Sequence, residues 1–418
     1  MRSKNIKENM PVEQTDTLAN SHQQRGNFQG ALKGYQNILR INSSCSEAHN
    51  NLGKVYQELG QSEEAVICYQ NAIRINANYA DAHYNLGNLY QSLGEYQQAL
   101  FFYSAVIRIN PDCVEGHNNL GKVYQELGQS EEAVSCYQNA IRINADYINA
   151  HYNLGNLYRS LSECQQAIAW YQATLDLCDG ALALNPSDDQ VYTLRQNAVH
   201  LLSSQIGVTT KTAPKHYIQS LFDDYAKRFD HHLVEVLDYK VPKLLKNILL
   251  GLQSKNVNFD VAIDLGCGTG LSGEAFRPLC KKLVGIDLSP KMLEIAKKKE
   301  VYDVIENIDL NKYLNNDLEK YDLFIATDVL IYIGDLSQLF SNISGASKSG
   351  AVFLFSTEST NTNDYLLTNR GRYAHSDKYV NQLARLHQFT ILNVENTILR
   401  TEEGKGVDGQ LFILKYLG

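Results

Sequence analysis

The sequence predicts a two-domain protein, in which an all-α superhelix of repeats precedes an α/β domain with a mostly parallel sheet. Three observations predict this fold class. One set of residues recurs every 34 positions in the first part of the 418-residue chain, and an apolar strand then enters a glycine-rich turn at Val261–Gly273. From that turn onward, apolar strand-like runs alternate with amphipathic helical ones, as in sheets covered by helices on both faces.

The repeat is visible in a leucine followed by a small residue. Its members are Leu18-Ala19, Leu52-Gly53, Leu86-Gly87, Leu120-Gly121 and Leu154-Gly155, with alanines at Ala31, Ala65, Ala99, Ala133 and Ala167. Residues 47–80 and 115–148 differ at only 4 positions, so a two-repeat block has been copied. This period and pattern resemble the tetratricopeptide repeat, a helix–turn–helix array.

These patterns place the expected domain boundaries. We expect the array at 12–205, with five repeats, a fifth repeat lengthened by seven residues, and a capping helix over about 188–205. Residues 206–215 are small and polar with one proline and are predicted to be a linker. The second domain then spans 216–418 and opens with an apolar helical stripe running from Tyr217 to Leu233.

The glycine-rich turn predicts a nucleoside-containing ligand. Gly266, Gly268 and Gly270 allow a sharp turn and a close approach of the ligand, and Asp287 ends the next apolar run about twenty residues later. The spacing G-x-G-x-G differs from the dinucleotide fingerprint G-x-G-x-x-G, and the lysine of a P-loop is absent. Asp264 beside the loop favours a ligand that carries positive charge instead of a pyrophosphate.

The run D-L-G-C-G-T-G, followed by G-I-D-L-S, resembles the class I S-adenosylmethionine-dependent methyltransferases. The resemblance implies a Rossmann-like, seven-stranded sheet that ends in an antiparallel hairpin, helices before the first strand that act as a lid, and S-adenosylmethionine as cofactor. The cofactor-binding residues that it implies are Asp264, Gly266, Gly268, Gly270, Asp287, Leu288, Met292, Asp309 and Thr327. For Asp309, which would accept from the adenine amine, a helix cap is the alternative.

Methyl transfer also needs a base if the acceptor must lose a proton. His375, Asp328 and Tyr332 are the favoured candidates, and His375 is preferred because it follows the fifth strand, where substrate-recognition insertions occur in the family. Tyr373, His216 and His231 are further candidates. The run after strand four is not the N-P-P-Y motif of amide and adenine methyltransferases. Arg370 and Arg372 would either hold an acidic substrate or be surface charge.

Asparagines recur in the array directly before the leucine–glycine pair. Asn51, Asn85, Asn119 and Asn153 are again 34 residues apart. They resemble the asparagine ladder in the repeats of O-GlcNAc transferase, which implies a groove for peptide backbone, because each amide both donates and accepts. The alternative is that these amides make hydrogen bonds between neighbouring helices.

Composition limits the class of partner and the location. Residues 1–205 contain 13 Lys and Arg against 20 Asp and Glu, and the whole chain carries a net charge of −8, so no basic footprint for nucleic acid is present. We expect no membrane span, no signal peptide, a cytoplasmic location and a bacterial origin. The 8 cysteines are expected to be reduced, and no metal site is predicted.

Three functional hypotheses follow. The first is a methyltransferase whose repeats recruit a protein or peptide acceptor. The second is a small-molecule O- or N-methyltransferase whose repeats only dock a partner protein. The third is a non-enzymatic scaffold, which an intact glycine loop with Asp264 and Asp287 disfavours. The sequence leaves the acceptor atom and the oligomeric state open.

Overall fold

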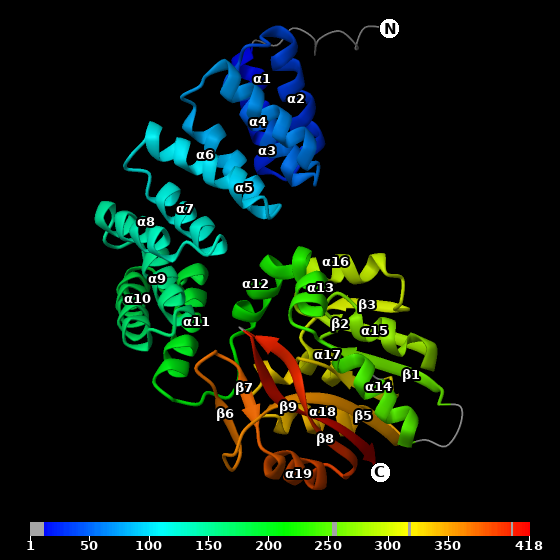
Figure 1. Ribbon diagram of the computed structural model, residues 1–418. Helices are drawn as coiled ribbons and strands as arrows, with labels where there is room; N and C mark the ends of the chain where they lie inside the picture. The colour runs from blue at the N-terminus through cyan, green and yellow to red at the C-terminus, as the bar shows by residue number, and fades with distance from the viewer. Residues whose placement is uncertain (1–11, 253–256, 317–318, 403) are drawn as a thin grey trace, which may run out of the picture. The chain divides into compact units, whose positions relative to one another are not determined.

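The computed structural model describes residues 12–252, 257–316, 319–402 and 404–418 (Figure 1). Its contacts divide the chain into two compact units, Met1–Leu177 and Cys178–Gly418. The division falls inside one long helix and not after residue 205, so the helix expected to cap the array belongs to the second unit. The domain boundaries read from the sequence therefore stay predictions.

The first unit consists of paired antiparallel helices. They are α1 (Val12–Gln24), α2 (Phe28–Ile41), α3 (Ser46–Glu58), α4 (Ser62–Ile75), α5 (Ala80–Ser92), α6 (Tyr96–Ile109), α7 (Val114–Glu126), α8 (Ser130–Ile143), α9 (Ile148–Ser160) and the first part of α10 (Cys164–Leu184). Helix α10 has 21 residues where α8 has 14. The seven-residue extension predicted for the fifth repeat is present.

The conserved spacing of the repeats has a packing cause. In each pair a tyrosine of the second helix is fully buried, as at Tyr69 and Tyr137. A Cβ atom built on Gly53 or Gly121 would lie 2.7 Å or 2.6 Å from the Cε1 atom of that ring. Because real Cβ contacts are longer, only glycine lets these helices approach across the tyrosine. The glycine–tyrosine contact recurs every 34 residues from the second pair onward, whereas the first pair has Ala19 at this position.

The second unit is an α/β domain. Its helices are α11 (Asp189–Gln205), α12 (Lys215–Tyr225), α13 (Phe229–His231), α14 (Val241–Leu252), α15 (Leu271–Phe276), α16 (Pro290–Lys298), α17 (Leu310–Asn316), α18 (Ser337–Ala346) and α19 (Asp377–Leu386). Short 3₁₀ turns cover Ala226–Arg228, Arg277–Leu279 and Leu330–Tyr332, and a π turn covers His232–Val236. The strands are β1 (Phe259–Leu265), β2 (Cys280–Asp287), β3 (Val304–Asn307), β4 (Tyr321–Ala326), β5 (Ser347–Ser359), β6 (Tyr365–Leu367), β7 (Tyr373–His375), β8 (Phe389–Glu402) and β9 (Lys405–Tyr416).

The sheet has the predicted doubly wound core. Strands β3, β2, β1, β4 and β5 are neighbours in that order, and all of these pairs are parallel. Strand β9 is antiparallel to β5 and to β8, so the expected C-terminal hairpin is present. The direction of β8 therefore matches that of β5, and the carboxyl ends of β1, β2, β4, β5 and β8 meet at one edge. Ligands of such sheets bind at this edge.

Helices cover both faces of the sheet (Figure 1). On one face, Phe340 of α18 and Val380 of α19 pack against Ile263 and Phe353. On the other face, Leu245 of α14 packs against Ala262 and its neighbours on the sheet. Ala262 and Ile263 are adjacent in β1 and point to opposite faces, as the alternation of a strand requires. Both cores hold the edge with the carboxyl ends in a fixed geometry.

The sequence did not predict the β6–β7 hairpin, which β7 attaches to the far end of β5 through Glu358 and Ser359. Residues of the predicted linker before α12 form hydrogen bonds with this hairpin. The Thr209 hydroxyl accepts from the Leu367 backbone N–H at 3.2 Å, and the Thr210 and Tyr373 hydroxyls are 2.5 Å apart. The predicted linker thus packs beside the β6–β7 hairpin.

Candidate functional site

The glycine-rich loop leaves the carboxyl end of β1 in a conformation that requires glycine. Gly266, Gly268 and Gly270 have φ angles of +74°, +53° and +95°, all in the left-handed region. A Cβ on Gly266 would also lie 2.4 Å from a methyl group of Val329. Larger residues would strain the loop, since L-amino acids avoid these φ angles. The loop therefore presents bare backbone at the ligand edge of the sheet.

Asp287 links this loop to the end of β2. Its carboxylate accepts the backbone N–H of Gly268 at 2.9 Å and that of Ser289 at 2.8 Å. Burial raises the pKa of Asp287, and these N–H donors oppose the rise. A carboxylate offers about four acceptor positions, so Asp287 still has capacity for the hydroxyl pair of a ribose.

Asp264 lies fully buried near the end of β1 and is incompletely paired. Its Oδ2 atom accepts from the Tyr302 hydroxyl at 2.6 Å, whereas its Oδ1 atom has no hydrogen-bond partner among the described residues. Burial raises the pKa of Asp264 to about 7. A buried acceptor without a donor is costly, and a bound ammonium group would supply one. This observation fits the aminoacyl group of S-adenosylmethionine.

The residues expected around the adenine lie after β2 and β3. Met292 is buried, and its N–H donates at 3.1 Å to the hydroxyl of Ser289, which caps α16. Leu288 is half-buried. Asp309 caps α17 by accepting the Lys312 N–H at 3.0 Å, which is the alternative that the sequence left open for it. Its second oxygen is 3.2 Å from the Lys215 amine. The cofactor role of Asp309 remains a prediction.

The segment predicted to be a lid contacts the loops that follow β1 and β2. Asp223 of α12 accepts from the Ser289 hydroxyl at 2.5 Å, and Asp230 of α13 accepts from the Thr269 hydroxyl. Lys299 adds an ion pair to Asp230 at 2.8 Å. These contacts fasten α12 and α13 to the same loops that carry the expected cofactor residues.

Thr327 and Asp328 follow β4, next to the glycine loop. The Thr327 hydroxyl is 2.6 Å from the Ser272 hydroxyl. Asp328 has a φ of +59°, which is rare for a residue other than glycine, and its N–H donates to the Ser356 hydroxyl at 3.0 Å. Such strain persists only where surrounding contacts hold it and is common at functional sites.

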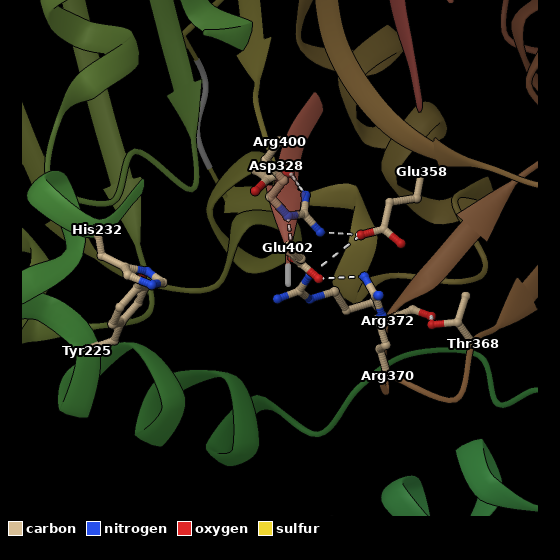
Figure 2. A network of polar contacts seen from close by, with 9 residues as sticks. All are labelled: Tyr225, His232, Asp328, Glu358, Thr368, Arg370, Arg372, Arg400 and Glu402. Atoms are coloured by element: carbon tan, nitrogen blue, oxygen red, sulfur yellow. Dashed lines mark hydrogen bonds and ion pairs between the residues drawn. The ribbon is translucent and has the colours of Figure 1, made fainter. Parts of the chain in front are cut away.

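An ion network extends from Asp328 along this edge of the sheet (Figure 2). We call it the arginine network; its members are Asp328, Glu358, Arg370, Arg372, Arg400 and Glu402. Arg400 pairs with Asp328 at 2.8 Å, with Glu402 at 2.6 Å and with Glu358. Arg370 pairs with Glu402 at 2.6 Å, and Arg372 pairs with the same carboxylate.

The network balances three guanidinium groups with three carboxylates. The nearby arginines lower the pKa of Glu402 to about 2. The alternatives left open for Arg370 and Arg372 were substrate binding and surface charge. Here both guanidinium groups hold an internal carboxylate. The Tyr225 hydroxyl and His232 Nδ1, which are hydrogen-bonded, lie on the segment predicted to be a lid, across from these charges (Figure 2).

The structure gives His375 an environment unlike that of a base. The side chain is fully buried, and its Nε2 donates to the carbonyls of Ile333 and Gly334 at 2.9 and 3.1 Å. Burial lowers its pKa to about 4. No surface of His375 is open to an acceptor, so its hydrogen bonds instead hold the β6–β7 hairpin onto the turn after β4. The role of His375 as the base stays a prediction, and this environment does not favour it.

Tyr332 is also nearly buried, and it packs edge-on against Phe222 of α12. Burial raises its pKa to about 12, so its hydroxyl keeps its proton at neutral pH. Asp328 remains partly exposed but is committed to Arg400. Of the three favoured base candidates, only Asp328 therefore offers an accessible oxygen.

The asparagines of the array bond to other side chains of the array. The amide of Asn85 donates to Asn50 at 2.9 Å, and that of Asn153 donates to Asn118 at 2.8 Å. Asn119 donates to Tyr84 and Asn88, and the amide oxygen of Asn51 accepts from Asn50 at 3.5 Å. The inter-repeat hydrogen bonds that the sequence left open are thus present, and a bound peptide would have to exchange for them.

The sequence did not point to the acidic and basic residues at the end of β8. Arg400 and Glu402 end a strand whose carboxyl end shares the ligand edge with β4. Their signal is their place at the carboxyl end of a strand, since ligands of such sheets bind there. Tyr302 belongs to no motif in the sequence. Only the fold brings its hydroxyl within hydrogen-bond distance of Asp264.

Three further findings concern the cysteines, the metal-binding groups and the apolar helices of the described residues. All eight cysteines lie in described segments and are free. No group of three or more His, Cys, Asp or Glu side chains able to hold a metal ion is found among the residues that the structure describes. Within the same residues, no helix combines the length and apolar character needed to cross a membrane.

Family models match both units. A model described as a methyltransferase domain matches residues 263–353. Models of the tetratricopeptide repeat match residues 58–94, 80–113, 124–162 and 150–184. The matches coincide with the glycine-loop sheet and with the helical pairs described above.

Curated relatives match about a quarter of the chain. A ubiquinone biosynthesis O-methyltransferase of Coxiella burnetii is 27% identical over 110 residues, which are 25% of this chain and 47% of that protein. A malonyl-[acyl-carrier protein] O-methyltransferase of Serratia marcescens is 28% identical over 116 residues, or 26% and 42% of the two chains. The chain thus spans about half the length of the curated relatives it matches.

Solved structures with similar parts include both kinds of protein. The tetratricopeptide protein YrrB is 22% identical, with a TM-score of 0.37 over 47% of this chain and 92% of its own. The N-methyltransferase NodS of Bradyrhizobium japonicum, in complex with S-adenosylhomocysteine, is 18% identical, with a TM-score of 0.38 over 47% and 97%. The family models thus show tetratricopeptide repeats followed by a methyltransferase domain, whose sheet has the class I methyltransferase fold.

Proposed function

We propose that this chain transfers a methyl group from S-adenosylmethionine. The observation that carries the proposal is the unpartnered, buried Oδ1 atom of Asp264, beside a loop whose glycines all have left-handed φ angles. An ammonium group would pair with that oxygen, and bare loop backbone would accommodate the ligand that carries it. Asp287 at the end of β2 would hold the ribose hydroxyls.

When bound, S-adenosylmethionine supplies a methyl group on a positively charged sulfur. The residues of this chain would position the acceptor against that methyl carbon and exclude water. Tight positioning alone accounts for a large part of the acceleration in such displacements. The lid contacts of Asp223 and Asp230 with the cofactor loops support closure over the reacting groups.

We infer a protein or peptide acceptor that the repeat array recruits. Tetratricopeptide arrays present the same helix positions along one surface, and Asn85 and Asn119 recur there in half-buried positions. Their amides would exchange one side-chain partner for peptide groups. Replacing both with alanine should raise KM for the acceptor and leave kcat unchanged, whereas an unchanged KM contradicts recruitment.

A small-molecule O-methyltransferase is the second candidate. The names of the two curated relatives reported above favour it, because both are O-methyltransferases. In that case the array docks a partner protein, and the asparagine replacements leave both kinetic constants unchanged.

Calorimetric titration with S-adenosylmethionine tests the proposal. The intact chain should bind at micromolar level, and Asp287→Ala should lose about 1–3 kcal/mol because ribose hydroxyls lose their partner. Asp408→Ala is the matched control, because this aspartate is exposed on β9. Failure of the intact chain to bind would leave only a scaffold function and refute the proposal.

A further inference from the structure

Two arginines converge on one carboxylate where the network is partly exposed to solvent. Arg370 and Arg372 both pair with Glu402, and their side chains are 42% and 26% exposed. Glu402 itself is 17% exposed, whereas Arg400 behind it is 2% exposed. We call Arg370 and Arg372 the arginine fork. Its accessible face differs from the sealed inner part of the network.

The charges of the network allow Glu402 to leave the fork. Arg400 would keep Asp328 at 2.8 Å and Glu358 as partners, so its buried charge stays compensated. The six named members are three arginines and three carboxylates, and Arg372 also lies 3.7 Å from Glu358. If Glu402 left, these six groups would lose one negative charge, and one incoming carboxylate would restore it. Two guanidinium groups suit such a group well, because each can donate in a planar, paired geometry.

The surrounding side chains offer little basicity. His375 is sealed and donates to backbone carbonyls, Tyr332 keeps its proton, and Asp328 is paired with Arg400. The Nδ1 atom of His232 on the lid is bonded to the Tyr225 hydroxyl, and burial lowers the pKa of this imidazole. An acceptor that must lose a proton is poorly served by this arrangement. A carboxylate is already ionised at neutral pH and needs no base.

We propose that the methyl acceptor is a carboxylic acid, whose carboxylate displaces Glu402 from the arginine fork and is converted to a methyl ester. This inference rests on the proposed methyl transfer and names its substrate class. A carboxylate oxygen attacks the methyl carbon, a C–O bond forms, and the C–S bond breaks with its electron pair passing to sulfur. The sulfonium becomes a neutral thioether, and no proton is released.

Glu402 then acts as an internal competitor for the fork. A tethered group has a high effective concentration, and an outside ligand binds with an affinity reduced by the fraction of time that the site is free. Removing the charge of Glu402 should therefore tighten the binding of an outside carboxylate. Loss of the fork should abolish that binding in either background.

The test titrates glutarate into the full chain saturated with S-adenosylhomocysteine, followed by NMR of the arginine side chains. Glu402→Gln should bind glutarate at least tenfold more tightly than the wild type, and Arg372→Gln should not bind it. Glu395→Gln is the matched control, because this glutamate is exposed on the same strand and should leave the affinity unchanged. N-acetylglutamate amide, titrated in parallel, represents a carboxylate on a peptide, whereas glutarate represents a small free acid. The probe that binds more tightly shows which kind of acid the arginine fork prefers.

Equal glutarate affinity in the wild type and in Glu402→Gln would overturn the proposal, as would binding that survives Arg372→Gln. Should Glu402→Gln fail to fold, Glu402→Asp carries the same test. Its shorter side chain reaches the fork less well, and glutarate should bind several-fold more tightly than to the wild type. Saturation with S-adenosylhomocysteine is measured first, so a failure of the cofactor site is distinguished from a failure of the carboxylate assignment.

Discussion

Replacing Arg400 with methionine tests whether the arginine network stabilises the second unit. The guanidinium is 2% exposed and pairs with three carboxylates, of which Asp328 at 2.8 Å and Glu358 have it as their main partner. Methionine keeps most of the apolar bulk and removes the charge. Breaking a buried pair by removing one partner costs about 3–5 kcal/mol, because the remaining charges stay desolvated. We expect a loss of stability in this range.

Hydrogen exchange is the suitable assay, because the single tryptophan, Trp170, lies in the first unit and does not report on the sheet. Amides of β4 and β5 should exchange faster by the factor that corresponds to the lost free energy. Arg385→Met, at an exposed position of α19, is the control and should change nothing. A loss below about 1 kcal/mol in Arg400→Met would refute the reasoning, since surface ion pairs contribute that little.

Three further predictions concern packing and pH. Gly121→Ala places a Cβ 2.6 Å from the Tyr137 ring and should destabilise the array by about 1–3 kcal/mol in urea unfolding, whereas Gly180→Ala, with nothing within 4 Å, should not. His375 should titrate near pH 4 by NMR; because the unfolded chain binds its proton more readily, the stabilisation from neutral His375 is complete above pH 6.5 and is lost as pH falls toward 4. Glu402, whose pKa falls from 4.5 to about 2 in the folded unit, stabilises it fully above pH 4.5, and this contribution is lost as pH falls toward 2. Acid unfolding should therefore lose part of its pH dependence in Glu402→Gln, and an unchanged profile would contradict this assignment.

Local chemistry made the cofactor side of the site predictable. Gly266, Gly268 and Gly270 were singled out because a sharp turn needs them, and all three have left-handed φ angles. Asp287 was placed at the end of the second strand, where it reaches the loop. Both features depend on residues close in sequence or on a strand–turn–helix unit with fixed geometry.

The acceptor side depends on contacts between distant segments and was predictable only in part. Strands β6 and β7 have three residues each, too short to show a period of two. The apolar stripe of the lid was correct as a helical pattern, but the helix breaks into turns after Tyr225. His375 is a residue type that can act as a base, and it follows the fifth strand, where the family has substrate-recognition insertions. Only the three-dimensional packing reveals that its side chain is buried.

Parallel titrations of S-adenosylmethionine and NAD into the full chain test the central claim most directly. A G-x-G-x-G loop with an unpartnered Asp264 oxygen should bind the sulfonium ligand at micromolar level and leave the dinucleotide unbound, because a pyrophosphate brings negative charge toward that carboxylate. Binding of NAD, or no binding of S-adenosylmethionine, would contradict the assignment of this site to methyl transfer.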